Sequence, residues 1–266
     1  AIRAINDPIS IEELGAIALV CINNPPVNAT GLAVRQGLQQ AIEVLNSEGV
    51  VQAIGIYAAG RTFVAGADIR EFGKPPMPPA LPDVFNVIED SAIPVVAVMH
   101  GTALGGGFEL GLSCHARVGI EGLKIGLPEI NLGLLPGAGG TQRVPRLAGI
   151  PMALDMALSG RQVAAKEALE KGLIDRLVVG DPREVALKAA QDVVAGALVT
   201  RRTCDLVTPK DDKALNDTAE MLKKTQAHMF SCHKIVEAVR ASYLPRSEGL
   251  KIERQAFMDS MQTPQR

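Results

Sequence analysis

Apolar residues along the first three quarters of the chain form two alternating patterns, continuous runs and stripes with helical spacing. The continuous runs predict buried strands at residues 17–22, 51–58, 93–99, 116–120 and 124–125. The striped segments predict helices at residues 31–45, 81–88, 104–112, 139–147, 151–158, 164–171 and 182–194. Because strands and helices alternate and the strands are apolar on both faces, we predict an α/β layered domain with helices covering the sheet.

The pattern changes near residue 195. Beyond this point the sequence is more polar, and residues 221–239 and 249–261 are each predicted to form an amphipathic helix. We therefore predict an α/β core over residues 1–195 and a helical extension over residues 196–266.

Composition narrows the classes of function. The 266 residues are 47% hydrophobic with a net charge of −2, which predicts a large core and no basic surface for nucleic acid or membranes. The four cysteines are far apart and lack metal-ligand spacing, which is typical of a reducing compartment and predicts no metal site. No apolar run is long enough for a membrane helix. We expect a cytoplasmic protein or, since the chain begins with Ala, a piece of a longer one.

Two glutamates occur in apolar, glycine-rich surroundings. Glu109 lies within Gly105–Leu110, and Glu129 lies within Gly126–Ile130. An ionised carboxylate is costly to remove from water unless it is paired or its pKa rises. Two such groups brought together indicate acid–base chemistry near neutral pH. Taken alone, however, a helical glutamate usually lies on the surface.

Two loops of small residues follow predicted strands, at residues 62–69 and 100–107. Small residues let a ligand approach the backbone, and a helix that starts at Gly105–Gly107 leaves N–H groups unpaired. One N–H group from each loop can converge on an oxygen that gains charge, which defines an oxyanion hole. Gly106 and Glu109 are three residues apart and share a helix face. Pro128 is expected to place Glu129 on an irregular segment.

The ordered set of motifs resembles the crotonase (enoyl-CoA hydratase/isomerase) superfamily over about residues 10–195. The motifs are Phe63–Ile69, Gly101–Leu110 and Gly126–Arg143. This resemblance implies a spiral of ββα units, which periodicity alone does not distinguish from a doubly wound sheet. Residues 23–29 are most similar to the N-terminal hydratase/isomerase part of bifunctional β-oxidation enzymes. No strand–Gly-x-Gly-x-x-Gly–helix unit is present, so the NAD-dependent step of those enzymes is not expected here.

The resemblance implies a role for individual residues. The backbone N–H groups of Ala67 and Gly106 would hold the thioester oxygen. Glu109 would activate a water for attack at C3 of a 2-enoyl-CoA, and Glu129 would deliver a proton to C2. With a 3-enoyl-CoA, Glu129 could instead move a proton between C2 and C4. The implied contacts with substrate or coenzyme A are Ala65, Asp68, Ile69, Arg70 and Gly137.

The same motifs allow two other interpretations. One is thioester hydrolysis, dehalogenation or decarboxylation of an acyl-CoA on the same fold. The other is an inactive relative that binds acyl-CoA. The presence of both acids favours hydration. A serine hydrolase is excluded because no Gly-x-Ser-x-Gly elbow is present.

The resemblance also implies an assembly and a setting. We expect no cofactor, since coenzyme A is part of the substrate, and a homo-oligomer, trimer or hexamer, unless the chain belongs to a longer bifunctional protein. In that last case the peroxisomal matrix is the expected compartment. Leu134, Leu135, Phe72 and residues 74–82 are candidates for the acyl-chain tunnel.

Overall fold

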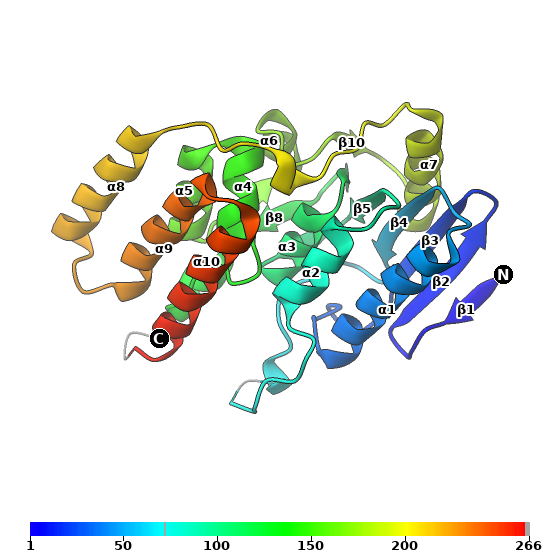
Figure 1. Cartoon of the computed structure of the whole chain (residues 1–266), viewed down its shortest axis with the longest axis horizontal. Coiled ribbons are helices and arrows are strands. Elements are labelled where there is room, and N and C mark those ends of the chain that lie inside the picture. The colour runs from blue at the N-terminus through cyan, green and yellow to red at the C-terminus, as the bar shows by residue number, and fades with distance from the viewer. Residues whose placement is uncertain (72, 264–266) are drawn as a thin grey trace.

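Two β-sheets organise the fold in the computed structural model, which describes residues 1–71 and 73–263, the side chain of Ile69 excepted (Figure 1). The larger sheet has seven strands in the order β1 (Ile2–Ala4), β2 (Ile9–Leu14), β3 (Ile17–Ile22), β4 (Ala53–Ala58), β5 (Val95–Met99), β7 (Ala116–Ile120) and β10 (Arg176–Val178). From β3 to β10 neighbouring strands are parallel, whereas β1 and β2 are added as antiparallel strands. The smaller sheet joins β6 (Thr102–Leu104), β8 (Lys124–Gly126) and β9 (Val163–Ala164).

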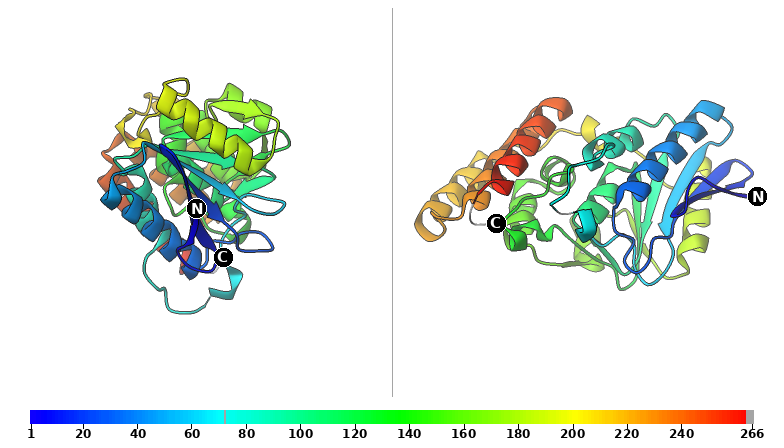
Figure 2. Two further views of the ribbon diagram at one scale, coloured as in Figure 1. Left: turned by 90° about the vertical axis from the view of Figure 1, so that its right-hand side faces the viewer. Right: turned by 90° about the horizontal axis from the view of Figure 1, so that it is seen from below.

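Helices cover both faces of the larger sheet (Figure 2). On one face Val20, Ile54 and Ala97 pack in the main core with residues of α1 (Leu32–Glu48), α2 (Leu81–Glu89) and α3 (Gly106–Ser113). On the other face the neighbouring residues Leu19 and Val96 pack with Ala186 and Ala189 of α7 (Pro182–Ala195). Successive side chains of a strand point to opposite faces, so strands that are apolar throughout serve both layers.

The remaining helices extend the molecule away from β1 (Figure 1). They are α4 (Gly140–Ala148), α5 (Ile150–Ser159), α6 (Ala165–Glu170), α8 (Asp212–Thr225), α9 (Phe230–Arg240) and α10 (Arg246–Met261). Short 3-10 helices lie at η1 (Ile69–Glu71), η2 (Pro128–Leu132), η3 (Thr203–Asp205) and η4 (Ala241–Tyr243). Helix α10 packs against α9, η4 and α4. Within the described residues, no helix has the length and apolar character needed to cross a membrane.

The predicted α/β layering is confirmed, and the strands at 17–22 and 116–120 have the predicted bounds. The single helix predicted over residues 221–239 is wrong, because α8 ends at Thr225 and α9 begins at Phe230. The hairpin lets the apolar stripes of both helices, including Leu222 and Ile235, reach the main core. The helix predicted at 104–112 starts later, since residues up to Leu104 pair with β8. The division at residue 195 stays a prediction.

Candidate active site

Three glutamates from distant parts of the chain meet near the first turn of α4. Glu109 comes from α3, Glu129 from η2 and Glu253 from α10. Only 2% of Glu109 and 1% of Glu253 are exposed. A buried carboxylate is costly unless hydrogen bonds or protonation compensate for the lost water. The three glutamates differ in the hydrogen bonds that compensate for the lost water.

Glu109 is held by backbone donors. Its Oε2 atom accepts hydrogen bonds from the N–H groups of Ala138 and Gly140, both at 2.8 Å. These groups belong to the N-terminus of α4, where unpaired N–H groups and the positive end of the helix dipole favour a negative charge. Burial nevertheless raises the pKa of Glu109, against the effect of these donors and of the positive charge of Arg143.

Glu129 has no comparable support. Its carboxylate lies against Gly105, where a Cβ atom would come within 2.8 Å of Oε2. Its Oε1 atom is buried, and no described residue hydrogen-bonds to it. Burial, followed by repulsion from Glu109, raises the pKa of Glu129 to about 8. The protonated carboxyl is therefore the stable form of Glu129 at neutral pH. The residue lies in a 3-10 helix, so the prediction of an irregular segment is corrected: Pro128 starts a regular turn.

Glu253 caps the same turn of α4 from the other side. It accepts hydrogen bonds from the N–H groups of Gly139 at 2.8 Å and Thr141 at 3.1 Å, and from the Thr141 hydroxyl. Burial, followed by repulsion from Glu109, raises the pKa of Glu253 to about 8. Sequence reasoning misses this residue. The signal that could have found it is the buried stripe of α10, where a glutamate takes a place among Gly249, Ala256 and Ser260.

The two small-residue loops lie side by side next to Glu129. Ala65 forms a parallel bridge with Leu104, and the N–H of Leu104 donates to the carbonyl of Val64 at 3.2 Å. Gly107 packs so closely on the Val64 carbonyl that a Cβ atom would overlap it. These contacts bring together the loops that carry Ala67 and Gly106.

The backbone N–H groups of Ala67 and Gly106 are not used within the fold. Among the described residues, neither donates a hydrogen bond. Gly106 is the first residue of α3, one position after the Gly105 on which Glu129 rests. Ala67 is exposed, and the preceding carbonyl of Gly66 accepts the N–H of Thr30 at 3.1 Å. The fold therefore leaves donors free in the two adjoining loops.

The residues predicted to contact coenzyme A lie in different surroundings. Arg70 is exposed and forms a bidentate ion pair with Asp68, donating Nε and Nη2 to the carboxylate. This pair lowers the pKa of Asp68. Gly137 faces the ring of Phe257 on α10, which leaves no room for a side chain. The side chain of Ile69, and Phe72, lie outside the described residues.

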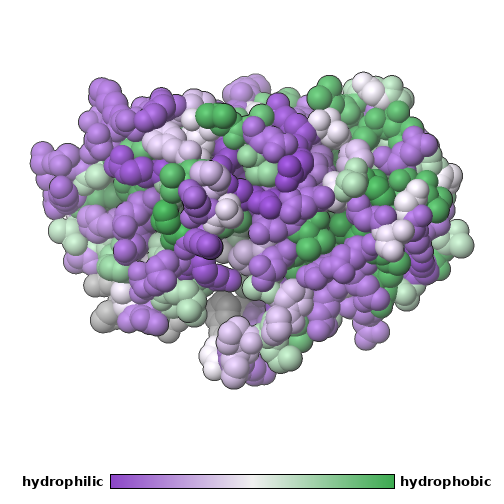
Figure 3. All heavy atoms as spheres, viewed as in Figure 1, coloured by the Kyte–Doolittle hydropathy of each residue, from purple (hydrophilic) through white to green (hydrophobic). Residues whose placement is uncertain are grey.

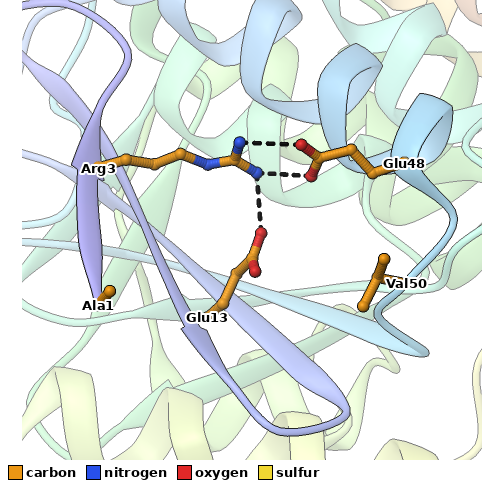
Figure 4. A pocket seen from close by; sticks show the side chains of 5 residues that line it. All are labelled: Ala1, Arg3, Glu13, Glu48 and Val50. Atoms are coloured by element: carbon orange, nitrogen blue, oxygen red, sulfur yellow. Dashed lines mark hydrogen bonds and ion pairs between the residues drawn. The ribbon is translucent and has the colours of Figure 1, made fainter.

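Open surface pockets lie elsewhere. One is bordered by Ala1 and Val50 at the β1 end of the molecule (Figure 4). There Arg3 donates to Glu48 and Glu13, so its charge is already neutralised by two carboxylates. In the part of the chain that the structure describes, no group of three or more acidic, His or Cys side chains is arranged to hold a metal ion.

Comparison with known proteins places this geometry in context. A family model described as enoyl-CoA hydratase/isomerase matches residues 12–251. The chain is 44% identical over 244 residues to a peroxisomal bifunctional enzyme of Danio rerio, covering 90% of this chain and 34% of that protein. It is 34% identical over 250 residues to a probable enoyl-CoA hydratase of Bacillus subtilis, covering 91% and 92% of the two chains.

A solved structure of an enzyme with a related name is similar to this chain over most of its length. An enoyl-CoA hydratase from Bacillus anthracis superposes with a TM-score of 0.64 at 26% identity, covering 97% of this chain and 92% of that one. The chain spans about a third of the length of the bifunctional relatives, 34% for the Danio rerio protein.

Proposed function

The chain belongs to the enoyl-CoA hydratase/isomerase family, and from this premise we propose that it adds water across the 2,3 double bond of a 2-enoyl-CoA thioester in fatty-acid β-oxidation. The observation that carries the proposal is the pairing of two glutamates, buried Glu109 and half-buried Glu129 with its buried Oε1 atom, with unused backbone donors at Ala67 and Gly106. Hydration needs both parts: carboxyls that handle protons and donors that hold developing negative charge.

Glu109 is the proposed base. Both backbone donors bond to its Oε2 atom, so Oε1 is available to accept a hydrogen bond from water. As the water oxygen bonds to C3, its proton passes to this carboxylate. The fixed donors of Ala138 and Gly140 orient the group before reaction.

Glu129 is the proposed acid. With its pKa near 8 it carries a proton at neutral pH and can deliver it to C2. One proton then returns from Glu109 to Glu129 to restore the starting state. The absence of a hydrogen-bond partner among the described residues leaves Glu129 Oε1 free for the substrate carbon.

Ala67 and Gly106 form the proposed oxyanion hole. Addition at C3 builds enolate charge on the thioester oxygen, and a donor held in place contributes roughly 3–4 kcal/mol to the transition state. We propose that Ala65, Asp68, Ile69, Arg70 and Gly137 line the path of coenzyme A. Arg70 commits Nε and Nη2 to Asp68, which leaves Nη1 for a phosphate.

A second activity follows from Glu129. Converting a 3-enoyl-CoA into a 2-enoyl-CoA removes a proton from C2 and delivers it to C4, and one carboxyl can do both if it starts ionised. With a pKa of about 8, Glu129 has a minor ionised fraction at neutral pH that can start this step, and its Oε1 atom has no partner among the described residues. Other reactions of an acyl-CoA, such as hydrolysis, dehalogenation or decarboxylation, are distinguished by product analysis.

The test is a pair of isosteric variants. Glu109→Gln should lower hydration of crotonyl-CoA by roughly 10²-fold or more while retaining isomerisation of a 3-enoyl-CoA, because general-base catalysis contributes about that much. Glu129→Gln should lose both activities. Exposed Glu248, changed to Gln, is the matched control. Unchanged hydration in the Glu109→Gln variant would remove the role assigned to it.

We further propose that the isolated chain assembles as a homotrimer or hexamer, unless it is part of a longer bifunctional protein. We expect the isolated homo-oligomer in the cytoplasm and the longer bifunctional protein in the peroxisomal matrix. The Danio rerio relative is named a peroxisomal enzyme. Light scattering on the purified chain tests the assembly, and a tagged chain followed by microscopy tests the compartment.

A further inference from the structure

Helix α10 supplies a carboxylate to the turn that holds Glu109. Glu253 lies in the middle of the face that α10 buries, between Gly249 and Ala256. The side that α8 to α10 turn outward is largely hydrophilic (Figure 3). An acidic residue would reach water on that outward side, yet this one is 1% exposed and carries three hydrogen bonds.

Glu109 and Glu253 share one run of four backbone donors. Ala138 and Gly140 donate to Glu109, whereas Gly139 and Thr141 donate to Glu253. The turn depends on Gly139, whose φ of 103° falls in the region that favours glycine. The four donors therefore alternate along the chain between the two carboxylates. Moving either group changes the turn that orients the other.

We propose that Glu253 is a positioning residue of the active site, which holds the turn at residues 138–141 so that Ala138 and Gly140 present their N–H groups to Glu109. The effect on catalysis rests on the proposed function, but the effect on the turn does not. Glu253 does not touch the reacting atoms; it acts through the backbone. The helical extension is then part of the active site rather than an appendage.

The charge of Glu253 should also affect the pKa of Glu129. The groups that act on the three glutamates are Arg143 of α4 and Arg254 of α10, which both favour the ionised form of Glu109. On α9, Lys234 is engaged with Glu237 and Asp259. Glu253 itself raises the pKa of Glu129 by repulsion. The Glu253→Gln change removes the negative charge that Glu253 gains as pH rises through about 8, so the pKa of Glu129 should be lower in that variant.

A simpler role would be docking of α10 alone. In that case substitutions would lower the free energy of unfolding and leave the catalytic pH profile in place. The positioning role instead predicts a loss in kcat, a nearly constant KM and a displaced profile.

The experiment uses the whole chain with Glu253→Gln and Glu253→Ala, and Glu248→Gln as a control on the same helix. Glu253→Gln keeps the shape but removes the charge. Its expected result is a kcat for crotonyl-CoA hydration lowered roughly tenfold or more, as for small displacements of a catalytic group. The alkaline limb of its pH profile should move to lower pH. The control should match the parent chain in both.

Amide hydrogen exchange gives a readout independent of turnover. In Glu253→Ala, exchange at Ala138–Thr141 should be faster than in the parent chain, while β3 keeps its protection. Unchanged exchange at these amides overturns the inference, and so does an unmoved pH profile in an active parent. A parent chain that does not hydrate crotonyl-CoA but shows the exchange effect overturns the proposed function and leaves the positioning of the turn in place.

Discussion

The rate of hydration should fall as pH rises through about 8, because Glu129 must carry a proton to deliver it. Burial and the neighbouring Glu109 raise its pKa from 4.5 to about 8. Above that value each pH unit lowers the protonated fraction about tenfold, so about one tenth remains at one unit above the pKa and about one hundredth at two. The raised pKa of Glu109 should add a fall in rate on the acid side.

The assay is the kcat for crotonyl-CoA, measured at saturating substrate across the neutral to alkaline range. Stability must be followed in parallel. The folded pKa of Glu129 lies above its unfolded value, so the stabilisation linked to its proton is complete below the unfolded value near 4.5 and is lost as pH rises through about 8. Circular dichroism at each pH separates unfolding from titration of the site.

A kcat that stays constant through two pH units above 8, in protein that circular dichroism shows to be folded, would refute the reasoning. It would mean that Glu129 is not the proton donor or that bound substrate removes the effect of burial. A profile of kcat/KM, which reports the free enzyme, distinguishes these two cases.

Two further predictions concern the frame of the site. Gly107→Ala should lower the free energy of unfolding by roughly 1–3 kcal/mol and reduce activity, because the new methyl group would overlap the Val64 carbonyl; unchanged urea unfolding would contradict this. Glu89→Gln should cost roughly 3–5 kcal/mol, since it leaves the guanidinium of Arg143 buried without its 2.9 Å ion pair. Urea unfolding measures this loss too, and an unchanged free energy of unfolding would contradict the prediction.

Local patterns predicted those parts of the fold whose causes are local. The strands at 17–22 and 116–120 were predictable because continuous apolar runs buried on both faces leave a direct mark on the sequence. The crotonase fold was predicted from ordered motifs and is confirmed by solved relatives of the same family. Periodicity alone could not separate it from a doubly wound sheet. The break between α8 and α9 was missed, because both helices carry apolar residues at helical spacing.

Part of the candidate site was also predictable, because two of its residues stand out in the local sequence. Glu109 and Glu129 stand out because glycines and apolar residues surround them in sequence. Glu253 does not, since it reaches Gly139 across 114 residues and lies in a helix of mixed polarity. The stripe of Gly249, Ala256 and Ser260 indicates the buried side of α10, but only the tertiary fold shows what Glu253 contacts there. A raised pKa for Glu129 was expected from its apolar setting, but its size was beyond local reasoning, because it depends on burial in the fold and on the neighbouring Glu109.

Three acids can share this site because the fold treats them unequally. The N-terminus of α4 provides four successive donors and divides them between Glu109 and Glu253, while Glu129 receives none of them. Repulsion within such a cluster keeps the carboxyls from all ionising together. Burial, followed by repulsion from Glu109, raises the pKa of both Glu129 and Glu253 to about 8, although only Glu253 receives donors of the turn. In this proposal the extension does more than cover the core, because Glu253 holds two donors of the turn while the other two are presented to Glu109.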